Sequence, residues 1–325
     1  MKTACVYHSI DLDGWMSAAI VQYWFISKSL SHLTEIDLNN PNTIEFIGYN
    51  YGQPLPGLAD YDQVILVDIS FPKEIMLELN VRLGEKLIWI DHHQRTVNEV
   101  NAYIIEHGIP MEGLVTEDGE LKAACELTWE YFFPEETMPE IVRLLGRYDC
   151  FGHMGTPEER TVVEFQYGAR ECIASYEEAY QKLSHCTHVK ESEYWFLQAQ
   201  VIVDQILEKG RSIYGYLCTE AKQVYQNGFD INIDLDSEYR TGKISKFICI
   251  NKERFNAINF GIDYHAQGYD GQACFHRIKD GKWGFSFYSQ TVDCSAIAKL
   301  FGGGGHKGAA GCVVDDETML KIINS

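Results

Sequence analysis

The sequence lacks several features that would place it in a specialised class of protein. It has ten cysteines in 325 residues, but no two form a CxxC pair, which argues against a zinc ribbon. No run of about 18 apolar residues suggests a membrane span, and MKTACVYHSI is too polar for a signal peptide. Internal repeats and low-complexity tracts are also missing. We therefore expect a cytoplasmic protein with reduced thiols in its core and no membrane partner.

Positive charge is scarce as well. The chain has 27 Lys and Arg against 47 Asp and Glu, a net charge of −20 at pH 7. Proteins hold long nucleic acid by neutralising many phosphates with basic side chains, so this balance excludes a long duplex as a partner. A short anionic substrate remains compatible if metal ions and a local group of donors supply the positive field.

Apolar runs alternate with helix-like stretches in the first half of the chain. The strand-like runs are ACVYHS, IEFIGYNY, QVILVDIS and KLIWIDHH. Residues 14–28 and 72–83 have the spacing of helices and lie between these runs. Such alternation is typical of a mainly parallel sheet flanked by helices.

The second half changes character twice. Residues 158–218 read as nearly all helical, and after them come the short strand-like runs FICI, QACFHRI, KWGFSFYS and GCVVDD. A KDGK turn and a CSAIAKLF helix lie among these runs. Because 325 residues exceed the usual size of one domain, we predict an α/β protein in three parts. Residues 1–190 form a first domain, 191–225 a helical linker, and 226–325 a smaller mixed α/β domain.

The segment HSIDLDG places His8, Asp11 and Asp13 where the first apolar run ends. Carboxylates this close repel one another unless a cation lies between them, so a divalent metal is one explanation. The loop joins a strand to a helix, and in open α/β sheets such loops line the edge where ligands bind. The alternative is that Asp13 only caps the helix that starts at Gly14. This segment alone supports both interpretations equally.

Further acids and histidines follow later strands. Asp68 ends VILVDIS, the group Asp91, His92 and His93 ends LIWIDHH, and Asp149 follows a helical segment in GRYDC. A mixed set of imidazoles and carboxylates suits Mn²⁺, Fe²⁺ or Co²⁺ better than Ca²⁺ or a structural Zn²⁺. The order of these residues on successive elements therefore predicts a site for two metals.

The motifs HSIDLDG, VDIS, IDHHQ and GRYD, taken together, resemble the four motifs of the DHH phosphoesterase superfamily. The segment FGGGGHKGAAG, at residues 301–311, is similar to the signature of the C-terminal domain found in one branch. That branch includes NrnA-type oligoribonucleases, which also act on pAp, and RecJ-type nucleases. Inorganic pyrophosphatases of the superfamily carry a different C-terminal domain, so the resemblance makes that activity less probable.

The resemblance implies a centre for two divalent ions, Mn²⁺ first, with Mg²⁺ or Co²⁺ as substitutes. Two ions side by side activate water and stabilise an in-line displacement at phosphorus. The implied ligands are His8, Asp11 and Asp68 for one ion, and Asp13, Asp68, His92 and Asp149 for the other. Asp68 would bridge the two ions.

Two neighbours of these ligands also receive roles from the resemblance. His93, one residue beyond a ligand, would face the substrate phosphate. Asp91 would orient the imidazoles, because a metal-bound histidine nearly always donates its other N–H to an acceptor.

The glycine-rich segment is expected to bind the end of the substrate. Consecutive glycines let backbone N–H groups turn toward an anion, and two donors follow them. The expected contacts are Gly303, Gly304, Gly305, His306 and Lys307. Tyr288, in SFYS, stands where many oligoribonucleases have an arginine, which suggests base stacking or a different substrate end.

These features predict a Mn²⁺-dependent phosphoesterase for short oligonucleotides or small nucleotides such as pAp or linear dinucleotides. The protein is compatible with a homodimer. One alternative is a RecJ-like single-strand exonuclease, which would need a basic channel and additional domains. Another is a non-catalytic nucleotide-binding regulator whose metal site is structural.

Overall fold

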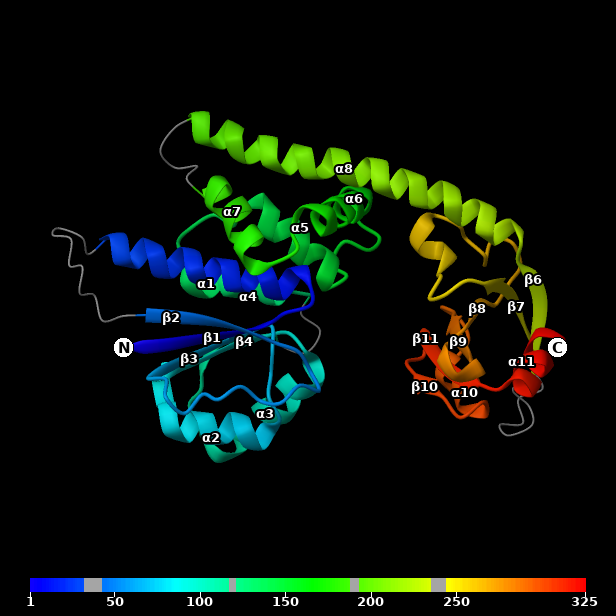
Figure 1. The fold of residues 1–325 in the computed structure, drawn as a ribbon, viewed down its shortest axis with the longest axis horizontal. Helices are drawn as coiled ribbons and strands as arrows, with labels where there is room; N and C mark the ends of the chain where they lie inside the picture. The colour runs from blue at the N-terminus through cyan, green and yellow to red at the C-terminus, as the bar shows by residue number, and fades with distance from the viewer. Residues whose placement is uncertain (32–42, 117–120, 188–192, 235–243) are drawn as a thin grey trace. The chain divides into compact units, whose positions relative to one another are not determined.

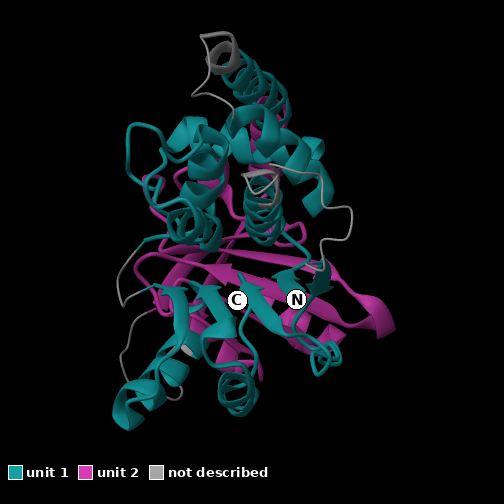
Figure 2. Ribbon diagram, turned by 90° about the vertical axis from the view of Figure 1, so that its left-hand side faces the viewer, with its two compact units in different colours: residues 1–214 teal, residues 215–325 magenta. Residues whose placement is uncertain are grey.

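The computed structural model describes residues 1–31, 43–116, 121–187, 193–234 and 244–325. These residues form two compact units, 1–214 and 215–325 (Figures 1 and 2). The predicted boundary between residues 190 and 191 lies outside the described residues.

The sheet of unit 1 is parallel throughout, with the strand order β2-β1-β3-β4-β5. Its strands are β1 (Lys2–His8), β2 (Thr43–Tyr49), β3 (Gln63–Val67), β4 (Leu87–Asp91) and β5 (Glu112–Val115). The first four strands overlap the predicted apolar runs, although β1 starts two residues and β2 one residue before its run, and the predicted parallel sheet is confirmed. The sequence analysis missed β5, because EGLV is short and contains a glycine.

Helices cover both faces of this sheet, as Figure 1 shows for α1 and α4 on one side and α2 and α3 on the other. The helices of this part of the chain are α1 (Leu12–Ser31), α2 (Lys73–Leu83), α3 (Gln94–His107), α4 (Ala124–Phe132), α5 (Glu140–Asp149), α6 (Glu159–Cys172), α7 (Tyr176–Thr187) and α8 (Glu193–Gln226). Within β1, Cys5 and Tyr7 face the α1 side, whereas Ala4 and Val6 face the α2 side. Burial on both faces explains the continuous apolar runs.

Unit 2 contains a mixed sheet with the order β10-β11-β9-β8-β7-β6. Its elements are β6 (Phe229–Asp234), β7 (Ile244–Asn251), β8 (Gly271–Arg277), β9 (Trp283–Tyr288), α10 (Cys294–Leu300), β10 (Gly304–Gly305), β11 (Ala309–Val314) and α11 (Asp316–Ile323). Strands β7 and β8 are parallel, and the other neighbouring strands are antiparallel. The predicted mixed α/β character of this part is therefore confirmed.

Helix α8 contains the boundary between the two units. Val203 and Ile206 belong to the core of unit 1, whereas Ala221 and Tyr225 pack in a core of unit 2. The stretch predicted as a linker thus contributes to two hydrophobic cores. None of the described helices has both the length and the apolar character that crossing a membrane requires.

Two glycines bring α6 and α8 into direct backbone contact. A Cβ atom at Gly168 would lie 1.9 Å from the carbonyl oxygen of Ile206, and one at Gly210 would lie 1.7 Å from that of Glu164. Real Cβ atoms do not approach this closely. The crossing of the two helices therefore depends on both glycines.

We expect Gly168→Ala to lower the free energy of unfolding by about 2 kcal/mol, because the new methyl group forces the two helices apart. Urea unfolding measures this. Gly215→Ala is the matched control, since Gly215 is also helical but a Cβ there would meet nothing within 4 Å. Alanine has the higher helix propensity, so the control should gain up to about 1 kcal/mol. Similar changes in both variants would contradict the close packing.

Candidate metal centre

The carboxyl ends of three neighbouring strands bring the predicted site residues together. His8 is the last residue of β1, Asp68 follows β3 directly, and Asp91 ends β4 just before His92 and His93. Because the strands are parallel and adjacent, these ends share one edge of the sheet.

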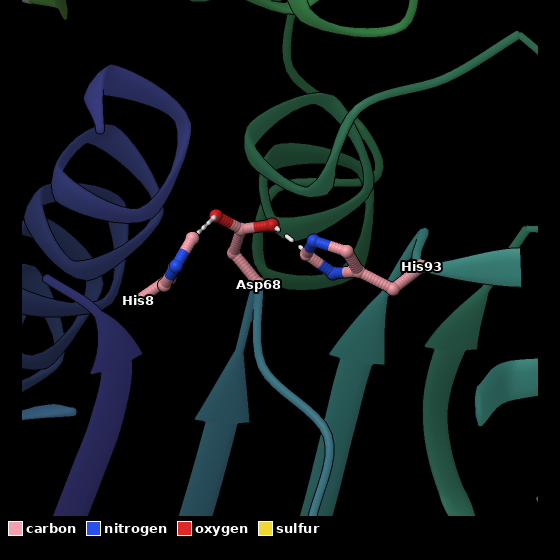
Figure 3. A group of neighbouring side chains, drawn as sticks. All are labelled: His8, Asp68 and His93. Carbon is pink, nitrogen blue, oxygen red and sulfur yellow. Dashed lines mark ion pairs between the residues drawn. The ribbon is translucent and has the colours of Figure 1, made fainter. Parts of the chain in front are cut away.

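Asp68 lies at the centre of this edge and is 1% exposed. Its Oδ2 is 3.4 Å from Nδ1 of His8, and its Oδ1 is 3.3 Å from Nε2 of His92 and 3.8 Å from Nδ1 of His93. Figure 3 shows Asp68 between His8 and His93. Its backbone has a φ of 56°, in the left-handed region, where strain is typical of functional sites.

The two carboxylates of the loop after β1, Asp11 and Asp13, have different hydrogen-bond partners. Asp11 accepts a hydrogen bond from the N–H of Gly14 at 3.0 Å, and its other oxygen is 2.8 Å from Nδ1 of His8. Asp13 instead accepts the N–H groups of Ala124 and Cys125, at 2.9 and 2.8 Å, at the start of α4. The interpretation that Asp13 caps its own helix is therefore wrong, because Asp11 fills that position.

Asp149, the last residue of α5, reaches the same edge. Its Oδ2 is 3.3 Å from Nε2 of His92, which is also 3.5 Å from Oδ2 of Asp13. His92 thus lies among three carboxylates.

Two groups of side chains have ligand atoms close enough to share an ion. One consists of His8, Asp68 and His93, and the other of Asp13, Asp68 and His92. Asp68 is common to both, as the sequence analysis expected of a bridging residue. The first group differs from the expected set, because it contains His93 where Asp11 was expected.

The carboxylates are crowded enough to disturb their own ionisation. Burial and repulsion from Asp68 raise the pKa of Asp13 to about 7. Burial and repulsion from Asp13 raise the pKa of Asp149 to about 7 as well. A further positive charge between these groups would relieve the repulsion.

The imidazoles respond in the opposite direction. Burial disfavours their charged form, but hydrogen bonds to Asp11 and Asp68 raise the pKa of His8 to about 10. The contact of His92 with Asp68 likewise outweighs burial and raises its pKa to about 10. Protons on the imidazoles therefore balance the carboxylates, and cations that bind here would displace them.

The residues present fit a divalent metal. Among the described residues, the clustered carboxylates form ion pairs with imidazoles and with no Lys or Arg. Nε2 of His8 is buried and has no hydrogen-bond partner in the described part of the chain, although buried polar atoms are normally paired. Imidazole nitrogens and carboxylate oxygens are also the ligand types that Mn²⁺ and related ions accept.

A buried network holds His93 in place. Asp91 is 0% exposed. Its Oδ1 is 2.7 Å from Nδ1 of His93 and also accepts a hydrogen bond from the backbone N–H of His92 at 2.7 Å. Its other oxygen accepts a hydrogen bond from the hydroxyl of Ser70, and this hydroxyl accepts one from Nε1–H of Trp89 at 3.0 Å. Nothing in the sequence indicated this role, since Ser70 looks like an ordinary loop residue and Trp89 lies in the middle of an apolar strand.

Some backbone N–H groups of the glycine-rich segment already donate hydrogen bonds within unit 2. The N–H of Gly303 donates to the carbonyl of Ala298 at 2.8 Å, and that of His306 donates to the carbonyl of Ala309 at 2.8 Å. The expectation that Gly303 turns its N–H toward an anion is therefore corrected. A Cβ at Gly303 would lie 2.2 Å from the carbonyl oxygen of Gly311, so close packing explains this glycine.

The other expected substrate contacts of unit 2 are accessible. Gly304, Gly305, His306 and Lys307 are exposed, and the first two pair with β11 as the short strand β10. Tyr288 is half-buried at the end of β9.

Comparisons with known proteins agree with this architecture. Residues 2–145 match the sequence model of the DHH family, N-terminal domain. The pGpG-specific phosphodiesterase PggH from Vibrio cholerae has a similar structure, with a TM-score of 0.51 and 13% identity over 99% of this chain and 96% of that one. RecJ from Thermus thermophilus, in complex with Mn²⁺, gives a TM-score of 0.41 and 14% identity over 98% of this chain and 50% of that one.

One similar sequence is the uncharacterised protein R106 of Acanthamoeba polyphaga mimivirus. It is 21% identical over 94% of this chain. The chain spans 66% of that relative's length, which is less than two thirds. The match to the DHH family, N-terminal domain, extends over the part of the chain that holds every residue of the candidate metal centre except Asp149.

Proposed function

We propose that this chain is a metal-dependent phosphoesterase that hydrolyses short oligonucleotides or small nucleotides. The observation that carries the proposal is the pair of His/carboxylate groups that share Asp68 at the sheet edge. The match of residues 2–145 to the DHH family supports a phosphoester as the bond that is cleaved. PggH, whose fold is similar, is a pGpG-specific phosphodiesterase, so a linear dinucleotide is the first substrate to test.

The proposed ligands combine members of the two groups with their neighbours Asp11 and Asp149. When bound, two divalent ions, Mn²⁺ first, would supply positive charge to the phosphoryl oxygens and lower the pKa of the attacking water. The proposed ligands are His8, Asp11 and Asp68 for one ion, and Asp13, Asp68, His92 and Asp149 for the other. The amide groups of α4 and the N–H of Gly14 hold Asp13 and Asp11 in position.

His93 is proposed to bind the substrate phosphate. Its side chain is 36% exposed, against 9% for His8 and 16% for His92, so it is the most accessible of the three imidazoles. Asp91 engages its Nδ1 and thereby fixes the ring. His93 is also close enough to Asp68 to be a ligand, and a separate measurement must distinguish the two roles.

Unit 2 is proposed to recognise the rest of the substrate. The accessible side chains of His306 and Lys307 offer positive charge or hydrogen-bond donors to a terminal phosphate. Gly304 and Gly305 leave room for a close approach, and Tyr288 offers a ring in place of the arginine found in many oligoribonucleases.

Asp68→Asn should abolish hydrolysis of a linear dinucleotide in Mn²⁺, because the amide cannot supply the negative charge that two cations share. Asparagine tolerates the left-handed backbone, so the fold should persist. Asp62→Asn is the matched control, since Asp62 is exposed and precedes the opposite end of β3. Residual turnover of a tenth or more of wild type in Asp68→Asn would show that the centre is wrongly placed.

His92→Ala and His93→Ala should differ in metal content. Loss of His92 should remove one ion, because its Nε2 lies among three carboxylates. Loss of His93 should leave both ions but reduce kcat. Counting bound Mn²⁺ in the two purified variants gives the answer. Equal loss of metal in both would make His93 a ligand.

Catalytic efficiency should fall from di- and tetranucleotides toward 20-mers, because a net charge of −20 repels every phosphate that projects beyond the centre. A kcat/KM series on single-stranded RNA of increasing length measures this. Efficiency that rises with length would favour the RecJ-like exonuclease. Metal and nucleotide binding without turnover of any member would favour the non-catalytic regulator.

A further inference from the structure

Tyr51 contacts two imidazoles of the centre, and the sequence analysis did not single it out. It follows β2 by two residues, and its ring centroid lies 5.7 Å from those of both His8 and His93, edge-on in each case. The two imidazoles are themselves 6.0 Å apart and flank Asp68. The tyrosine ring therefore forms a wall of the His8–Asp68–His93 group.

The hydroxyl of Tyr51 is anchored inside the protein. It accepts the N–H of Ser70 at 3.3 Å, and Ser70 is 2% exposed. Tyr51 as a whole is nevertheless 45% exposed. Since the hydroxyl end is turned toward a buried partner, the exposed surface belongs mainly to the ring. A ring fixed in this way loses little conformational freedom when a ligand packs against it.

The neighbouring loop adds apolar surface beside the charged centre. Ile10 is 60% exposed and immediately precedes Asp11. The N–H of Ser9 donates to the carbonyl of Tyr49 at 3.0 Å, which ties this loop to the end of β2. Ile10 and the ring of Tyr51 thus both leave apolar surface accessible near the charged centre.

The charges around the centre determine what that ligand can be. The described ion pairs of the cluster contain imidazoles and carboxylates and no Lys or Arg, and the whole chain carries a charge of −20. A second phosphate next to the first would be repelled here. A flat, neutral group attached to the phosphoester would not be repelled, and an aromatic ring provides a face for it.

We propose that Tyr51 is the surface on which a base of the substrate stacks, so that this centre selects phosphoesters of nucleosides over inorganic polyphosphates. The inference rests on the proposed phosphoesterase function and extends it by naming a residue that determines specificity. The edge contacts with His8 and His93 hold the ring, and its exposed part receives the base beside the phosphate.

The test compares Tyr51→Ala, Tyr51→Phe and wild type on a linear diadenylate and on its analogue with both bases replaced by hydrogen. Stacking is worth about 1–3 kcal/mol per base, so Tyr51→Ala should raise KM for the diadenylate about tenfold or more. Its KM for the abasic analogue and its Mn²⁺ content should stay at the wild-type level. Tyr51→Phe keeps the ring but loses the hydrogen bond from Ser70, so it should raise KM for the diadenylate less than Tyr51→Ala does.

Tyr103→Ala is the matched control. Tyr103 also stacks on an imidazole, since its ring centroid lies 4.0 Å from that of His107. It is remote from the centre, however, because it lies nine residues after the first residue of α3, about 13 Å along the helix. It should leave both KM values unchanged. A KM increase in this control equal to that of Tyr51→Ala would overturn the proposal.

Two other results would overturn it. Equal losses on the diadenylate and the abasic analogue, or loss of Mn²⁺, would mean that Tyr51 only supports the imidazoles. Failure of the proposed function is a separate outcome, in which wild type hydrolyses neither compound. The Kd of the diadenylate then decides the matter: a tenfold weakening in Tyr51→Ala supports stacking, and an unchanged Kd rejects it.

Discussion

Buried negative charge at one edge of a parallel sheet is the constraint around which unit 1 is organised. Asp13, Asp68 and Asp91 are each at most 2% exposed. Removing carboxylates from water is costly unless each finds compensating partners. The amides of α4 compensate Asp13, the imidazoles compensate Asp68, and a hydroxyl with two backbone N–H groups compensates Asp91. The strand ends, the start of α4 and the network behind β4 are arranged around these charges.

Under the proposed function, the distribution of charge determines how an acidic protein would bind a phosphoester. The cluster has no Lys or Arg among its described ion pairs, so attraction for a phosphate would come from divalent cations and from the imidazoles themselves. Salt screens such attraction beyond about 10 Å. The proposed enzyme would therefore discriminate by what lies close to the phosphorus and not by long-range capture of a polyanion.

Much of this arrangement could be predicted from the sequence, because apolar runs that end in acids mark strand ends at one sheet edge. His8 and His92 were expected to meet at Asp68, and their ring nitrogens lie 3.4 and 3.3 Å from its carboxylate oxygens. The partners of Asp13 could not be predicted, since Ala124 is 111 residues away and meets it only through tertiary packing.

Other misses have local causes. Helix α3 was not predicted, although Val97, Val100 and Ile104 recur at helical spacing. The N–H of Gly303 was expected to be free, yet it donates to the carbonyl of Ala298 in α10. A run of glycines shows where the backbone can bend and not which atoms it will meet. Tyr51 had no motif around it, and only its position beside two imidazoles reveals it.

Helix α8 constrains where recombination between related genes can join the two units. Because Val203 and Ile206 fill one core and Ala221 and Tyr225 fill another, the helix is indispensable to both units. A recombination event between residues 214 and 215 would leave each core with the turns of α8 that fill it, because the two pairs of residues lie on opposite sides of this point. The two units can therefore be exchanged between relatives by a crossover in the middle of the helix, provided that the helix stays continuous across the junction.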